Sequence, residues 1–232
     1  MRLLKIVLSV LFLASAGVAW AQERLVVVEL FTSQGCSSCP PADAILGELA
    51  EGGDVLALAL HVDYWDYIGW KDAFASPAHT KRQRAYARAR GERTIYTPQM
   101  VVGGVDHVIG TRPMKLAKLI NRHSGRPAQV NISLNRQGSD IEIDARALAA
   151  INGRYLVWVV RFRPQETVDI RRGENAGHTL TYHNIVTDLT EAGRWNGKGA
   201  FNATVQIPEG GEVAVMIQEE NAGPILAAAR AR

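Results

Sequence analysis

Two continuous apolar runs near the start of the chain restrict its fold more than any other feature. Leu25–Phe31 reads LVVVELF, and Val55–Val62 reads VLALALHV. Runs of this kind, without polar alternation, are typical of strands that are buried on both faces. Between them, Cys36–Ala50 has helical periodicity and is followed by a glycine pair. Two buried strands joined by a helix of this length predict a right-handed βαβ unit with parallel strands.

Strand and helix signals continue to about residue 124. A helical segment, Pro77–Arg90, begins with Ser76 as its N-cap and with proline at the first position. The remaining elements expected are the strands Gln99–Val102 and Val105–Ile109, separated by two glycines typical of a hairpin, and the helix Arg112–Ser124. The predicted order is β-α-β-α-β-β-α, with an aromatic-rich loop after the second strand.

The pattern changes after residue 125. Apolar residues now alternate with polar ones, as in Val130, Ile132 and Leu134, and Gly or Asn separates the segments. Seven or eight such strands over roughly 105 residues predict a β-sandwich or a β-extension. The fold class expected is therefore an α/β domain followed by an all-β, sandwich-like C-terminal domain or extension.

The N-terminus has the order of a secretory signal peptide. Arg2 and Lys5 precede an apolar stretch that ends near Leu13, and Ala19-Trp20-Ala21 gives the Ala-x-Ala cleavage pattern. A membrane anchor is the alternative, but the apolar run is shorter than the ~20 residues of a spanning helix. We expect a signal peptide over 1–21, domains over 22–125 and 126–232, and a soluble periplasmic or secreted product without a further membrane span.

The net charge and the number of cysteines limit the classes of function that the chain can have. A net charge of only +3 in 232 residues lacks the basic excess of a nucleic-acid-binding protein. The two cysteines, Cys36 and Cys39, are too few for a disulfide scaffold and form one Cys-x-x-Cys pair. At a helix N-terminus the macrodipole stabilises a thiolate, so the pKa of Cys36 should fall below about 8.5. Cys36 is then the exposed nucleophile, and Cys39 is the shielded thiol that resolves a mixed disulfide.

The Cys-x-x-Cys pair after a strand and before a helix, together with the later Thr97-Pro98, resembles the thioredoxin-like superfamily. The resemblance implies that the α/β domain has the thioredoxin-like fold and that Pro98 is cis. It also implies that the backbone of Thr97 offers hydrogen bonds to a substrate peptide. Glu29 is similar in placement to the buried acid that passes protons to the inner cysteine in thioredoxins.

Three longer segments are similar to one family of secreted bacterial proteins of unknown function. They are Val28–Asp43, His61–Asp72 and Tyr96–Val102. That family pairs a thioredoxin-like domain with a β-rich C-terminal part, and the resemblance covers essentially the whole mature chain. It implies a fold and supplies no substrate.

The residues favour an exported thiol-disulfide oxidoreductase that acts on protein disulfides or thiols. Its partners would be a client protein or peptide and a redox partner, and it would need no cofactor beyond its own disulfide. A purely structural disulfide is one alternative. Another is a non-enzymatic copper carrier that binds the metal through Cys36, Cys39 and His61, or a redox-sensing binding protein that uses the same cysteines.

The end of the second strand should lie at the same sheet edge as Cys36, because the two strands are parallel. Tyr64, Trp65 and Trp70 are therefore expected near the dithiol, where aromatic side chains could form a platform for a client peptide. The alternative is that they cover the domain junction. His61 is either an acid/base group, a metal ligand or a structural histidine.

Two polar features have no assigned mechanism. Helix Pro77–Arg90 carries a run of basic residues, which we interpret as a solvated face, with a docking surface for an acidic partner as the alternative. The segment Gly173–His178 is a polar turn before a strand that contains His183. It is either an ordinary loop or part of a metal site formed by His178 and His183. The basic residues are Lys81, Arg82, Arg84, Arg88 and Arg90.

Overall fold

The computed structural model of the chain describes residues 25–208 and 210–231. The expected signal peptide, 1–21, lies outside these residues. No helix in the described part of the chain is long and apolar enough to cross a membrane.

The elements expected before residue 125 are confirmed. Strands β1 (Val26–Thr32) and β2 (Val55–His61) are buried along their whole length and pair in parallel, from Val26 opposite Val55 to Thr32 opposite His61. The other elements are α1 (Pro40–Gly52), the short 3₁₀ helix η1 (Asp66–Ile68), α2 (Pro77–Ala89), β3 (Gln99–Val102), β4 (Asp106–Ile109) and α3 (Pro113–Ser124). Helix α2 begins as expected, because the Ser76 side chain accepts a hydrogen bond from the N–H of Ala78.

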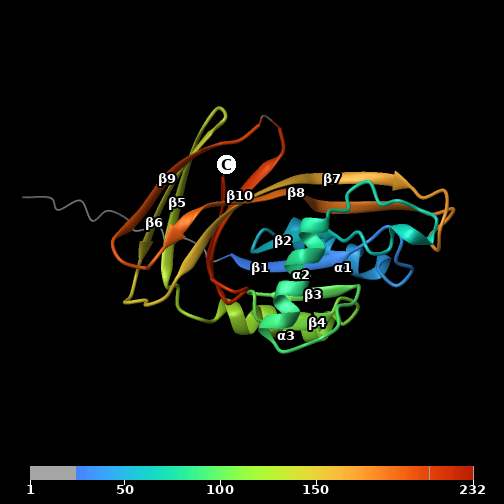
Figure 1. The fold of residues 1–232 in the computed structure, drawn as a ribbon, viewed down its shortest axis with the longest axis horizontal. Coiled ribbons are helices and arrows are strands. Elements are labelled where there is room, and N and C mark those ends of the chain that lie inside the picture. Colours follow the sequence, from blue (N-terminus) through green and yellow to red (C-terminus); the bar gives the residue numbers. More distant parts are fainter. Residues whose placement is uncertain (1–24, 209, 232) are drawn as a thin grey trace, which may run out of the picture.

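The described residues after 125 form seven strands, within the expected seven or eight. They are β5 (Val130–Gln137), β6 (Asp140–Ala147), β7 (Tyr155–Asp169), β8 (Thr179–Trp195), β9 (Ala200–Gln206), β10 (Glu212–Glu219) and β11 (Ile225–Ala231). Four of them join the first four strands in one mixed sheet of eight strands, ordered β11-β10-β7-β8-β2-β1-β3-β4 (Figure 1). Only β5, β6 and β9 form a separate sheet.

This topology corrects the predicted fold class. An α/β thioredoxin-like domain followed by an all-β, sandwich-like domain is wrong, because strands from both sides of residue 125 share one sheet. The protein is mostly β and is built around that mixed sheet. The link lies between β2 and β8, which pair in parallel at Ala59 and Ile185. Next to this pair, the carboxamide of Asn184 donates to the carbonyl of Ala57 at 2.8 Å.

The physical reason for the error is that alternation of apolar and polar residues indicates which face of a strand is buried but not which strand is its neighbour. The long strands β7 and β8 change surroundings along their length. Near Tyr155 their side chains enter the core shared with β5 and β6, whereas Phe162 and Val186 belong to the core beneath α2.

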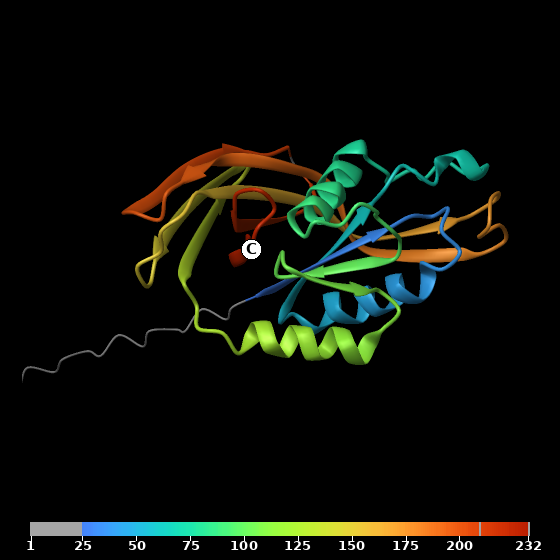
Figure 2. The ribbon, with the colours of Figure 1, turned by 60° about the horizontal axis from the view of Figure 1, so that its bottom comes forward.

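The helices divide the sheet into two faces, with α1 and α3 on one and α2 on the other (Figure 2). Successive side chains of β1 point to opposite faces of the sheet. Val28 and Leu30 pack with α1 and α3, whereas Val27 and Phe31 pack with Tyr86 of α2. Glu29 therefore points to the α2 face and Thr32 to the α1 face.

Candidate functional site

The Cys-x-x-Cys pair lies between the end of β1 and the start of α1. Cys36 and Cys39 form a disulfide, with their Cα atoms 5.4 Å apart. Cys39 is the residue before α1, and the carbonyl of Cys39 accepts the N–H groups of Ala42 and Asp43 at 2.8 and 3.1 Å. The prolines at 40 and 41 occupy the first turn, where no intrahelical N–H is needed. The sulfurs are thus next to the positive end of the helix dipole.

Both cysteines are buried, which corrects the expectation that Cys36 is exposed. Cys36 is 2% exposed and Cys39 is 0% exposed, whereas Ser37 and Ser38 between them are exposed. Segments distant in the sequence contact the backbone around Cys36. Trp65 lies against Gly35, because a Cβ on that glycine would be 3.2 Å from the Trp65 Cβ. Asn175 donates to the carbonyl of Cys36 at 3.0 Å.

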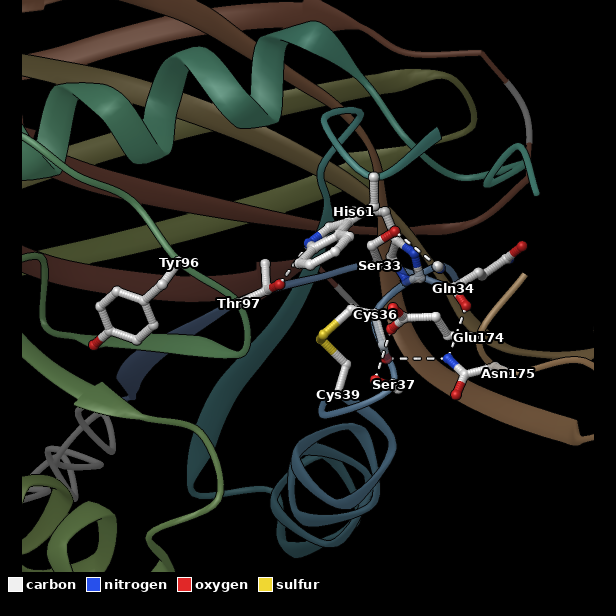
Figure 3. Close-up of a disulfide and its surroundings, with 12 residues drawn as sticks. Ser33, Gln34, Cys36, Ser37, Cys39, His61, Tyr96, Thr97, Glu174 and Asn175 are labelled. Carbon is white, nitrogen blue, oxygen red and sulfur yellow. Dashed lines mark hydrogen bonds between the residues drawn. A yellow bond between two sulfur atoms is a disulfide. The ribbon is translucent and has the colours of Figure 1, made fainter. Parts of the chain in front are cut away.

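The segment before β3 lies beside the disulfide (Figure 3). The Thr97–Pro98 peptide bond is cis, as the resemblance implies. The Thr97 hydroxyl accepts the indole N–H of Trp65 at 2.7 Å, and the Gln83 side chain donates to the Tyr96 carbonyl at 2.8 Å. Residues from α2 and the loop after β2 thus hold this segment in place.

The three aromatic residues expected near the dithiol are all tied to its surroundings. Besides the bond from Trp65, the Trp70 indole donates to Oε1 of Gln34 at 2.8 Å, and the Tyr64 hydroxyl donates to Gln83 at 3.1 Å. Their hydrogen bonds fasten the loop after β2 to the segments around the disulfide. A role for Thr97, Tyr64, Trp65 and Trp70 in binding substrate stays a prediction.

Glu29 is not brought together with the dithiol. It faces α2, where its carboxylate accepts Nε of Arg82 at 2.5 Å and the hydroxyl of Tyr86. Gln218 of β10 accepts from Arg82 and donates to Tyr86. We call Glu29, Arg82, Tyr86 and Gln218 the Glu29 cluster. Burial acts against the charge of Arg82, but the charge of Glu29, the hydrogen bond to it and the effect of Tyr86 together outweigh burial and raise the pKa of Arg82. The expectation that Arg82 belongs to a solvated face is therefore wrong.

A different buried acid lies on the helix that starts at the dithiol. Asp43 follows Cys39 by four residues, which places the two on the same face of α1. It is 5% exposed, and neither carboxylate oxygen has a hydrogen-bond partner among the described residues. Burial raises the pKa of Asp43 to about 7, against a smaller opposing effect of His61 and Thr32. The spacing from Cys39 was the available sequence signal for this residue.

His61 is held beside Asp43 by a second acid. Its Nδ1 is 2.7 Å from Oδ2 of Asp72, and both side chains are fully buried. Burial alone would raise the pKa of Asp72, but His61 and the N–H groups of Gln34 and Phe74 lower it below its usual range. The ring of Tyr182 packs at 4.9 Å from the His61 ring. We call Thr32, Asp43, His61, Asp72 and Tyr182 the Asp43 cluster.

The structure does not assemble either metal site that the sequence left open. Within residues 25–208 and 210–231, no group of three or more His, Cys, Asp or Glu side chains is placed to hold a metal ion. Nδ1 of His61 is taken by Asp72, and Nδ1 of His178 is 3.1 Å from the carbonyl of Asn175. His183 instead lies against α1, where a Cβ on Gly47 would be 2.7 Å from its ring.

Fold and site together define a mostly β protein with a buried Cys-x-x-Cys disulfide at a strand-to-helix turn. The chain belongs to a family described as proteins of unknown function (DUF1223), whose model matches residues 27–218. The expected membership in a family of unknown function is confirmed.

Solved structures similar to the chain include the following two. The X-ray crystal structure of a protein from Agrobacterium tumefaciens is 36% identical, with a TM-score of 0.78, and the match covers 90% of this chain and 95% of that one. The protein HBP35 of Porphyromonas gingivalis has a TM-score of 0.68 at 15% identity, over 90% of this chain and 75% of that one. At that identity the likeness concerns the fold alone. A search of curated proteins found no match.

Proposed function

We propose that the protein is an exported thiol-disulfide oxidoreductase that acts on protein disulfides or thiols through Cys36 and Cys39. The observation that carries the proposal is the bonded cysteine pair at the N-terminus of α1, directly after a buried strand. This position favours a thiolate on Cys36 in the reduced form. The charged, apolar and Ala-x-Ala order of the N-terminus supports a periplasmic or secreted location.

The proposed reaction transfers two electrons from the protein dithiol to a client disulfide. In the reduced protein, the Cys36 thiolate attacks a client disulfide, forms a mixed disulfide and releases one client sulfur as a thiolate. Cys39 then loses its proton, attacks the Cys36 sulfur and releases the second client sulfur. The Cys36–Cys39 disulfide is formed and the client disulfide is reduced. A dithiol donor protein returns the pair to the reduced form, and the reverse direction would oxidise client thiols.

The buried carboxylate that suits the deprotonation of Cys39 is Asp43 rather than Glu29. Asp43 is one helical turn from Cys39, and its pKa of about 7 lies near working pH, where a general base is most effective. Glu29 is engaged by Arg82 and Tyr86 on the other face of the sheet. The likeness to thioredoxin-like oxidoreductases is proposed for this local site and its chemistry alone.

The test is reduction of insulin disulfides with dithiothreitol as the electron donor. Cys36→Ser should abolish turnover, whereas Cys39→Ser should accumulate mixed disulfides that reducing agent releases. Ser38→Ala, between the two cysteines, serves as the control and should keep turnover. A wild-type protein that dithiothreitol converts fully to the dithiol, yet that reduces no protein disulfide, would contradict the proposal.

A further inference from the structure

Four strands lie at the edges of the two sheets, and they differ in how their outer edges are protected. An open row of backbone N–H and C=O groups can pair with another chain, so proteins usually shorten edge strands, charge them or cover them. Strand β5 contacts β11, the edge strand of the other sheet. Strand β4 has only four residues and begins with the charged Asp106. The remaining edge strand is β9.

Strand β9 lacks each of these protections. Its seven residues, AFNATVQ, include no charged residue and no proline. Its pairing with β6 runs from Ala200 opposite Arg146 to Gln206 opposite Asp140 without a bulge. Within the described part of the chain, the backbone of β9 forms hydrogen bonds with β6 alone. Its outer edge is therefore an uninterrupted row of open backbone groups.

The apolar side chains of β9 are incompletely covered. Phe201 and Val205 pack against the core shared by the two sheets, yet both are only partly buried. In the central strand β6, Ile141 lies opposite Val205 and is fully buried, as is Ile143 two residues further on. The difference arises because β6 has a neighbour on both sides and β9 has one. A further strand on the outer edge of β9 would complete the burial of its apolar side chains.

A second copy of β9 matches this edge by symmetry. When two copies pair antiparallel about a two-fold axis at Ala203, all seven residues are paired. Phe201 then lies opposite Val205 of the second copy on the core side, and Asn202 lies opposite Thr204 of the second copy on the outer side. Apolar residues meet apolar ones, polar residues meet polar ones, and no like charges meet. A two-fold axis makes one patch self-complementary, as in most protein dimers.

We propose that β9 pairs with β9 of a second copy of the chain, antiparallel and centred on Ala203, so that the two three-stranded sheets join into one sheet of six strands. This dimer does not depend on the proposed oxidoreductase function. The three-stranded sheet and the N-terminus of α1 lie at opposite ends of the molecule, so the interface is remote from both Cys-x-x-Cys segments (Figure 1). A single strand pair is smaller than a standard interface, so the expected dissociation constant is on the order of 10 μM.

The experiment measures the oligomeric state of the protein without its signal peptide. Sedimentation velocity is recorded at protein concentrations from about 1 to about 300 μM, on both sides of the expected dissociation constant. The wild type should change from monomer to dimer over this range.

Two double variants test the proposed register. Asn202→Lys with Thr204→Lys places like charges directly opposite each other across the axis, so the dissociation constant should rise about tenfold. Within one copy, these two positions face Asp144 and Glu142 of β6, so the added positive charges suit the fold. Asn202→Glu with Thr204→Lys places opposite charges across the axis and should dimerise at least as tightly as the wild type.

The matched control carries the same change of charge on the other edge strand of the sheet. Ser133 and Asn135 of β5 are exposed and face the same two acids, Asp144 and Glu142, from the other side of β6. Ser133→Lys with Asn135→Lys should therefore leave the dissociation constant unchanged.

A protein that stays monomeric over the whole range would overturn the proposal and leave the edge of β9 for a different polypeptide. A dimer that the variant with two lysines in β9 does not weaken would also overturn it. The same holds if the variant with Glu and Lys, or the β5 control, weakens the dimer as much as the two lysines in β9 do. Far-ultraviolet circular dichroism and thermal unfolding at about 1 μM, where the monomer dominates, show whether each variant is folded.

Discussion

The central sheet carries a buried polar cluster on each side of β1, and the two differ in how completely their polar atoms are paired. In the Glu29 cluster, the carboxylate of Glu29 accepts from Arg82 and Tyr86, and Gln218 completes the network. In the Asp43 cluster, polar atoms of Thr32, Asp43, His61 and Tyr182 are buried without a hydrogen-bond partner among the described residues. Of the two clusters, the Asp43 cluster alone includes a residue of α1, the helix that begins at the disulfide.

The difference separates a structural network from a candidate functional one. Buried polar atoms are nearly always paired, so a set of unpaired ones needs an explanation. A saturated network holds elements together, and here it joins β1, α2 and β10. In the unsaturated cluster, near the disulfide, burial raises the pKa of Asp43 to about 7, so this carboxyl group can bind or release a proton near neutral pH. The predictions below test this division, from the largest expected effect to the smallest.

The largest effect is expected from Arg82→Met. The change leaves the carboxylate of Glu29 buried without its cation, and loss of one partner of a buried ion pair destabilises proteins by about 3–5 kcal/mol. Urea unfolding at pH 7 measures it. The double variant Glu29→Gln, Arg82→Met should recover most of the loss, and a single variant within about 1 kcal/mol of the wild type would show that the pair is not the structural network inferred here.

Asp43→Asn should stabilise the protein at alkaline pH. The pKa of Asp43 rises from 3.8 to about 7 on folding, so the protonated form is favoured in the folded state. This contribution is present below pH 3.8 and is lost as pH rises through 7, by at most about 4 kcal/mol. Asparagine is always neutral and avoids the loss. The stability difference between variant and wild type should grow between pH 4 and pH 8 in urea unfolding, and a difference independent of pH would refute the assignment.

A pair of tyrosines gives a matched test of the two clusters. Tyr86→Phe removes a hydroxyl bonded to Glu29 and Gln218, which should lower the free energy of unfolding by about 2 kcal/mol. Tyr182→Phe removes a buried hydroxyl without a partner and should be neutral or stabilising. Equal losses in the two variants, measured by the same unfolding assay, would remove the contrast between the clusters.

The smallest expected effect is kinetic. The release of client from the mixed disulfide on Cys36 should slow by about tenfold at pH 7 in Asp43→Asn, because Cys39 loses a general base. The inflection of the rate near pH 7 should disappear in that variant and persist in Glu29→Gln. Stopped-flow measurement with a chromogenic disulfide across pH 5–9 checks both. An inflection that moves in Glu29→Gln instead would return the role to Glu29.

Local signals in the sequence predict much of the molecule. The apolar runs, the Ser76 cap and the glycine pair before β4 define their elements without reference to the rest of the chain. The place of the dithiol between β1 and α1 follows from the same signals. The four-residue spacing of Asp43 from Cys39 is a weak signal, because an acid in the first turn of a helix is common. The burial of Asp43 depends on β2 and β8, which pack against α1.

The features that the sequence does not predict depend on contacts between segments that are distant in the sequence. The eight-stranded sheet depends on the pairing of β8 with β2, and neither strand has a sequence pattern that identifies the other as its neighbour. The hydrogen bond to the carbonyl of Cys36 comes from Asn175, 139 residues further along the chain. From sequence alone, a polar loop rich in glycine is expected to be exposed to solvent, because its neighbour in the fold is unknown.

The pairing of β2 with β8 has a consequence for folding during synthesis. The hydrogen bond that links the two strands joins residues 127 positions apart. A chain emerging from its N-terminus therefore presents a largely apolar strand with an open edge until β8 has been made, and such an edge is a template for aggregation. The second edge of β2 is therefore covered only after the chain has been made as far as Ile185 of β8.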